Sequence, residues 1–246
     1  MYKKRTIYVF ILAILIAVIF ILIYLVNQKE ERKFAADGQI EIAPKTQMQE
    51  AQTEPEPERQ PESESEKATS ALISYLSEYN FAQTYNDCAP YNAAAVVRAL
   101  TGTNVSSAEF ARTISYRMEY NWTLPEGIIK QLNQNDISTL IPDLSAINDL
   151  EKIEYLRDRL LQKHPVILLV KKEDFQHYIT IFGFDSTKDE FYIYDSLMER
   201  LEGGLTKDEN SDMPGNKTLT TAELLKAWSG GELKGKYNWY AIVCSY

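Results

Sequence analysis

The sequence is poor in the residues that build metal sites and disulfide frameworks. Its 246 residues include two cysteines and two histidines, and these four do not have the spacing of zinc ligands. We therefore expect no metal and no other cofactor. A disulfide between Cys88 and Cys244 is conceivable outside the cytoplasm, but Cys244 lies in an apolar run and is expected to be a buried core residue.

Basic charge is also scarce. Lysine and arginine number 26 against 35 acidic residues, which gives a formal net charge of −9. No stretch gathers the basic residues into a stripe, which is the usual electrostatic footprint of a nucleic-acid-binding surface. We therefore expect no nucleic-acid partner. No internal repeat is evident in the sequence.

One long apolar run is present, beginning at Ile7 and ending at Val26. Its 20 uncharged residues could span about 30 Å of hydrocarbon as a helix. The basic residues of the first five positions precede it, so the positive-inside rule places the N-terminus in the cytoplasm and the rest of the chain outside. The sequence predicts a single-pass membrane protein whose residues 1–26 form the cytoplasmic end and the anchor.

A cleaved signal peptide is the alternative interpretation of this run. The apolar core of a signal peptide normally has about 7–15 residues, and a small-x-small cleavage site follows it. The nearest small residues here, Ala35 and Ala36, lie beyond a charged segment. We therefore expect an anchor that is not cleaved.

Residues 27–69 contain four prolines and many glutamates but almost no large apolar residues. Such a segment cannot bury enough surface to offset the entropy of ordering. It is predicted to be a disordered acidic stalk. Residues 70–246 are long enough for one domain with a core of its own.

Within this domain, helical patterns come first and strand patterns follow. Capping residues and apolar spacing predict helices at 88–101, 106–118, 124–133, 150–163 and 220–228. Short branched apolar runs predict strands at 166–170, 177–184, 190–195 and 238–246. Helices followed by antiparallel strands indicate an α+β fold.

A candidate nucleophile lies at the start of the first of these helices. Cys88 precedes Pro90, which suits a first helical turn, and Gly102 is placed to end the helix. The positive end of a helix dipole favours a thiolate. The side-chain amide of Gln83 and the backbone N–H of Cys88 could together hold an oxyanion. A small buried hydrophobe is the alternative role for such a cysteine.

The two histidines differ in context. His164 lies at a helix-to-strand junction and is expected at the surface, whereas His177 begins an apolar strand. If 177–184 and 190–195 pair as a hairpin, the start of the first strand lies beside the end of the second, where Asp195 is found. Asp195 could then orient the imidazole, as a catalytic triad requires. Alternatively, His177 is a hydrogen-bonded strand terminus.

Four segments together resemble one enzyme family. D-C-A-P-Y-N-A-A-A-V-V with Gln83 ahead of it, H-P-V-I-L-L-V, H-Y-I-T-I-F-G-F-D and F-Y-I-Y-D-S are similar to papain-like cysteine peptidases of the bacteriocin (double-glycine) leader-processing type, and to their stand-alone bacterial relatives. The resemblance implies Cys88 as nucleophile, His177 as general base and acid, Asp195 as orienter and Gln83 as oxyanion donor. It also implies a helical half packed on an antiparallel sheet, with a cleft between them.

The sequence departs from this family at two positions. Ala89 stands where a glycine usually follows the cysteine, and His164 stands where a glycine commonly precedes the proline. Ala89 could tighten the cleft beside the nucleophile. Peptidoglycan endopeptidases also carry an Asp-Cys pair, but their histidine follows much sooner in the sequence. We therefore rank this family second as a resemblance.

The sequence favours a membrane-anchored, extracytoplasmic thiol hydrolase that cleaves peptide or amide bonds of a peptide or protein substrate. Two alternatives stay open. The domain could be a catalytically idle papain-like module that binds a peptide or an envelope partner, or it could be a tethered head that only docks on a complex.

Overall fold

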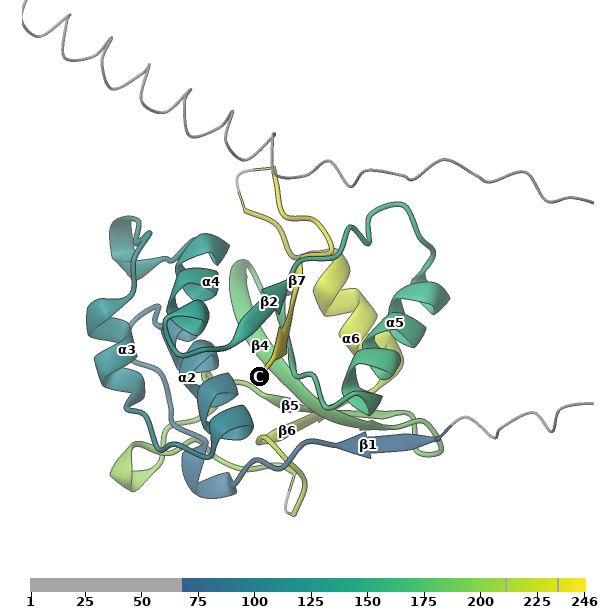
Figure 1. The fold of residues 1–246 in the computed structure, drawn as a ribbon, viewed down its shortest axis with the longest axis horizontal. Coiled ribbons are helices and arrows are strands. Elements are labelled where there is room, and N and C mark those ends of the chain that lie inside the picture. Colours follow the sequence, from purple (N-terminus) through teal and green to yellow (C-terminus); the bar gives the residue numbers. More distant parts are fainter. Residues whose placement is uncertain (1–67, 211, 234) are drawn as a thin grey trace, which may run out of the picture. The chain divides into compact units, whose positions relative to one another are not determined.

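In the computed structural model, which describes residues 68–210, 212–233 and 235–246, a seven-stranded antiparallel sheet carries helices on both faces (Figure 1). The α+β prediction is confirmed. The predicted anchor and most of the predicted stalk lie outside the described residues. Within the described part of the chain, no helix is both long and apolar enough to cross a bilayer.

The sheet follows the order β2-β7-β3-β4-β5-β6, and β1 pairs with the C-terminal end of β4. Its central strands are the predicted ones, β3 (Val166–Lys172), β4 (Phe175–Asp185), β5 (Glu190–Tyr194) and β7 (Ala241–Ser245). Three strands of three residues each were not predicted: β1 (Ser70–Leu72), β2 (Ser138–Leu140) and β6 (Lys217–Leu219).

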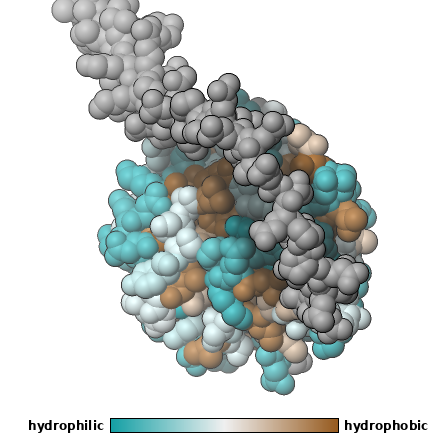
Figure 2. Space-filling model, turned by 45° about the vertical axis from the view of Figure 1, so that its right-hand side comes forward, coloured by the Kyte–Doolittle hydropathy of each residue, from teal (hydrophilic) through white to brown (hydrophobic). Residues whose placement is uncertain are grey.

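The helices form two layers around the sheet (Figure 1). One layer contains α2 (Cys88–Thr101), α3 (Ser107–Thr113) and α4 (Pro125–Asn133), and the other contains α5 (Asp149–Leu161) and α6 (Thr221–Ser229). Each layer buries its own apolar cluster against the sheet. On the face drawn in Figure 2, the remaining hydrophobic residues form separate patches among hydrophilic ones.

Local sequence signals explain where most helices begin. Asn148 with Glu151, and Thr220 with Glu223, form complete capping boxes at α5 and α6. Gly102 ends α2 with a φ of 70°, a left-handed conformation that glycine adopts without strain.

The predicted extension of the α3 segment to residue 118 is wrong. Ser106 caps α3 as expected, but the helix stops at Thr113 because Ile114 turns to an extended conformation and is buried in the core beneath α2. Tyr116 then adopts a positive φ of 56°, which a continuing helix does not allow. The chain after α3 is thereby directed toward the N-terminus of α2.

The hairpin of β4 and β5 contains a β-bulge. Ile181 pairs with Ile193 and Gly183 pairs with Tyr192, so Phe182 is an extra residue in β4. Gly183 also lies where β1 approaches closely, since a Cβ there would come within 2.6 Å of the Ala71 carbonyl oxygen. The bulge changes which side chains of the two strands share a face.

Candidate active site

The N-terminus of α2 is fixed to the sheet by one buried amide. Asn92 donates from Nδ2 to the carbonyl oxygens of Cys88 and Tyr178, each at 2.8 Å, and its Oδ1 accepts from the hydroxyl of Thr180 at 2.7 Å. Tyr178 adjoins His177 in β4. These bonds therefore set the position of Cys88 relative to His177 across two elements.

The β-bulge determines where Asp195 lies. Tyr194 pairs with Thr180, so the same register, continued by one residue, places Asp195 opposite Ile179. Ile179 and His177 are two residues apart and share a face of the sheet. If Phe182 were paired regularly with Ile193 instead of bulging, Asp195 would lie opposite Thr180, on the other face. The predicted hairpin thus correctly makes His177 and Asp195 neighbours. The bulge places their side chains on the same face of the sheet.

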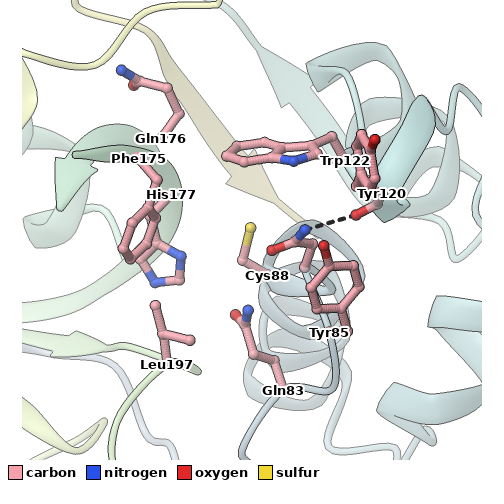
Figure 3. Close-up of a pocket in the computed structure, with 10 residues that line it drawn as sticks. Gln83, Tyr85, Cys88, Tyr120, Trp122, Phe175, Gln176, His177 and Leu197 are labelled. Atoms are coloured by element: carbon pink, nitrogen blue, oxygen red, sulfur yellow. Dashed lines mark hydrogen bonds between the residues drawn. The ribbon is translucent and has the colours of Figure 1, made fainter. Parts of the chain in front are cut away.

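The predicted residues meet at this point of the sheet. His177 Nε2 lies 2.8 Å from Asp195 Oδ1, and the Cys88 side chain lies close enough to the imidazole to help raise its pKa. Figure 3 shows the ring of His177 directed toward the Cys88 sulfur. Because Nε2 is used by Asp195, Nδ1 is the nitrogen left for the thiol.

Charge and burial act against each other at this pair. Burial by itself lowers the pKa of His177, but the charge and hydrogen bond of Asp195, with the contact to Cys88, outweigh it and raise that pKa from 6.5 to about 9. Burial raises the pKa of Asp195, yet His177 and Lys172 outweigh this effect and hold that pKa well below its usual range. The arrangement favours an imidazolium beside a carboxylate.

The Asp195 carboxylate is held by several donors. Besides His177, Oδ1 accepts from the backbone N–H of Leu197 at 2.9 Å, and Oδ2 accepts from Lys172 Nζ at 2.6 Å. The buried side chain of Asn216 bonds both the N–H and the carbonyl of Asp195, at 2.8 and 2.9 Å. The orientation of the carboxylate is therefore strongly determined.

Gln83 is tied to the residue that follows Asp195. Its backbone N–H donates to the Ser196 carbonyl, and the Ser196 hydroxyl donates to Gln83 Oε1, both at 2.8 Å. Because Oε1 accepts from Ser196, the Nε2 amino group is the part of the Gln83 side chain that can donate into the cleft. Gln83 lies below Cys88 on the same side of this cleft (Figure 3).

A cleft of about 560 Å³ opens at these residues. Aromatic and amide side chains form most of its wall, and none of the described residues that line it is an aspartate, glutamate, lysine or arginine. The lining residues are Gln83, Tyr85, Asn86, Cys88, Tyr120, Trp122, Phe175, Gln176, His177 and Leu197.

The segment after α3 forms one wall of the cleft and is bonded to the segment before α2. Asn86 donates to the Tyr120 carbonyl at 2.7 Å (Figure 3), and Asn121 donates to the Tyr85 carbonyl at 3.2 Å. Asp87, next to Cys88, forms an ion pair of 2.7 Å with Arg117. Cys88 and this wall are therefore positioned together.

A family model matches residues 72–214, which is more than half of the chain, and its description is the Peptidase_C39 like family. The chain belongs to this family. The assignment confirms the resemblance that the four sequence segments indicated.

Two solved structures are similar at low identity. The peptidase domain of Streptococcus ComA, a bi-functional ABC transporter involved in a quorum-sensing pathway, is 19% identical, with a TM-score of 0.45 over 68% of this chain and 98% of that one. A double-glycine-motif protease from an AMS/PCAT transporter, solved with its leader peptide, is 12% identical, with a TM-score of 0.46 over 71% and 93%. A search of the curated proteins found no match.

The two departures from the usual Peptidase_C39 pattern can now be placed. Ala89, in the first turn of α2, is fully buried in the core between this helix and the sheet. It is not among the described residues that line the cleft. The expectation that Ala89 tightens the cleft is therefore wrong, because its methyl group packs into the interior. His164 is partly exposed just before β3.

The two thiols lie in different places, since Cys88 lines the cleft and Cys244 is the buried core residue that the sequence predicted. Cys244 is a free thiol buried in β7, and burial raises its pKa. Cys88 is also free, so the alternative of a disulfide between the two is not realised. Among the described residues, no three histidine, cysteine, aspartate or glutamate side chains are grouped as metal ligands would be.

Several residues of the site were not singled out in the sequence. Asn92 could have been noticed, since it lies one helical turn after Cys88 and on the same face. Ser196 is adjacent to Asp195, but nothing in the sequence indicates that its hydroxyl reaches Gln83. Lys172 and Asn216 come from other strands or loops, so only the folded structure brings them to Asp195.

Proposed function

We propose that the domain is a cysteine peptidase whose catalytic residues are Cys88, His177, Asp195 and Gln83. The observation that carries the proposal is the placement of His177 between the Cys88 side chain and the Asp195 carboxylate. Membership of the Peptidase_C39 like family supports the same reaction.

In this mechanism, the Cys88 thiolate attacks the carbonyl carbon of the scissile bond. The negative charge that develops on the carbonyl oxygen is bound by the Cys88 backbone N–H and the Gln83 amide. The His177 imidazolium then donates its proton to the departing amine, leaving an acyl-enzyme. A water molecule that gives its proton to His177 attacks this thioester, and release of the carboxylic acid restores the Cys88 thiolate beside the His177 imidazolium.

The cleft suggests the kind of substrate. Its aromatic wall and the scarcity of charged groups favour an extended peptide with uncharged side chains around the scissile bond. A peptide substrate also agrees with the leader peptide bound in the AMS/PCAT protease structure. Charged residues near the cleaved bond would lose hydration without gaining a partner.

We further propose the cellular arrangement that the sequence predicts. Residues 1–26 would anchor the chain with its N-terminus in the cytoplasm, residues 27–69 would form the stalk, and residues 70–246 would act outside the cytoplasm. Protease added to intact cells or spheroplasts should then release the domain, and complete protection would contradict this topology.

The function is tested by hydrolysis of quenched-fluorescent peptide libraries rich in small and apolar residues. The wild-type protein should cleave a subset, and Cys88→Ser and His177→Ala should each abolish cleavage while retaining the wild-type circular dichroism spectrum. Cys244→Ala, which removes the other thiol, should remain active. Peptide binding without any turnover would favour the idle-module alternative.

A further inference from the structure

Lys172 is a charged residue beside the site for which the proposed mechanism gives no role. It is the last residue of β3, and its ammonium lies 2.6 Å from Asp195 Oδ2 and 3.5 Å from the Leu197 carbonyl oxygen. Asp195 Oδ1 already serves His177 and the Leu197 N–H. Lys172 is thus the partner of the carboxylate oxygen that faces away from the imidazole.

We propose that Lys172 is a positioning residue, which holds the Asp195 carboxylate in the rotation that serves His177 and offsets part of its negative charge. The inference rests on the proposed function, because it concerns the same histidine and aspartate.

Burial explains why the second oxygen needs a partner. Asp195 is 3% exposed, so little water reaches its carboxylate. A buried carboxylate oxygen without a donor is costly, and rotation of the group is one way to relieve that cost. The bond from Lys172 gives Oδ2 its donor, so the carboxylate gains nothing by rotating. The second bond of Lys172, to the Leu197 carbonyl, holds the backbone whose N–H donates to Oδ1.

Other charged groups surround the pair. Cys88 of α2 reaches His177 on the cleft side. On the other side, His177 and Asp195 line a small cavity of about 90 Å³ together with Lys171 and Lys172 of β3, Lys217 of β6 and Glu223 of α6. Of these lysines, Lys172 has the ion pair with Asp195.

Removal of this positive charge should change the basicity of His177. With Lys172 gone, the full negative charge of Asp195 acts on the imidazole, and the imidazolium becomes more favourable. Since the Lys172 side chain is 25% exposed, solvent weakens its effect. We expect the titration of His177 to move upward by on the order of one pH unit.

The presence of two histidines makes this shift directly measurable. In full-length protein carrying ¹³C-labelled histidine, NMR titration should give two imidazole curves, and a His164→Gln variant assigns them. Lys172→Gln keeps a hydrogen-bond donor but removes the charge, so His177 should titrate higher while His164 does not change. Lys172→Arg keeps the charge, so His177 in this variant should titrate close to its wild-type value.

Lys171→Met is the matched control, because it removes the same charge one residue away. A shift as large as that of Lys172→Gln would mean that general charge, not the ion pair, is responsible, and would overturn the proposal. An unchanged His177 titration in folded Lys172→Gln would also overturn it, because a structural role alone lowers stability without moving this curve. The readout does not depend on peptide cleavage, so it is separate from the test of the function.

Discussion

The hydroxyl of Ser196 donates a 2.8 Å hydrogen bond to Oε1 of Gln83. Ser196 directly follows Asp195, so one short turn orients both the partner of the imidazole and the proposed oxyanion donor. The Gln83 amide has two ends, and this bond determines which of them is available to the cleft.

Ser196→Ala should therefore lower kcat and leave KM nearly unchanged. Loss of a whole oxyanion donor costs about 10²–10³ in kcat. Loss of its orientation alone should cost less, roughly tenfold to a hundredfold. The double variant Ser196→Ala/Gln83→Ala should be no worse than Gln83→Ala, because the two residues act as a unit. Ser229→Ala, at an exposed hydroxyl at the end of α6, is the control in the same peptide assay. Additive losses would contradict the coupling.

Asn92→Ala should destabilise the domain and impair activity together. The change leaves the Tyr178 carbonyl and the Thr180 hydroxyl without their buried partner, and each such loss costs about 1–3 kcal/mol. The free energy of unfolding in urea provides the measurement. Asn135→Ala is a matched control, since Asn135 makes a similar bond to the residue four positions earlier, at 2.8 Å, but at the end of α4. Equal destabilisation by both changes would contradict the bridging role.

Arg117→Gln should slow alkylation of Cys88 at neutral pH several-fold. Arg117 neutralises Asp87, the residue next to Cys88, and an uncompensated carboxylate there disfavours a thiolate. Second-order rates with iodoacetamide, followed by mass spectrometry, measure the effect. The control is Arg112→Gln, whose ion pair with Glu109 is exposed. A rate unaffected by Arg117→Gln would show that Asp87 does not influence the thiol.

Stability should depend on pH through His177. Its pKa is raised in the folded state from 6.5 to about 9, so the folded state holds the proton more tightly than the unfolded state. This contribution is fully present below about pH 6.5 and is lost as pH rises through about 9. Urea unfolding across this range should show a decline in the wild type that is weaker in His177→Gln. Parallel curves for the two proteins would contradict the raised pKa.

The sequence predicted the elements that carry strong local signals. α5 and α6 begin at capping boxes, and β4 and β5 are apolar runs long enough to be recognised on either side of a turn. The three-residue strands β1, β2 and β6 are too short for periodicity to be visible. The end of α3 was misjudged because burial of Ile114 and the ion pair of Arg117 outweigh helical propensity.

The sequence predicted that Cys88, His177, Asp195 and Gln83 come together, but not which residues support them. Cys88 carried a helix-start signal, and His177 and Asp195 lay at related ends of a hairpin. The extra residue Phe182, which aligns the two strands, leaves no pattern of its own in the sequence. Contacts from Ser196 and Lys172 depend on side-chain directions that only the folded sheet defines.

The central claim, that His177 activates Cys88, is tested most directly by the rate of alkylation of Cys88 at about pH 6, where an ordinary thiol is almost wholly protonated. Iodoacetamide should modify the wild-type Cys88 at least about tenfold faster than Cys88 in His177→Ala, because the imidazolium keeps the sulfur as a thiolate. Equal rates in the two folded proteins, both matching a free thiol, would contradict the activated pair.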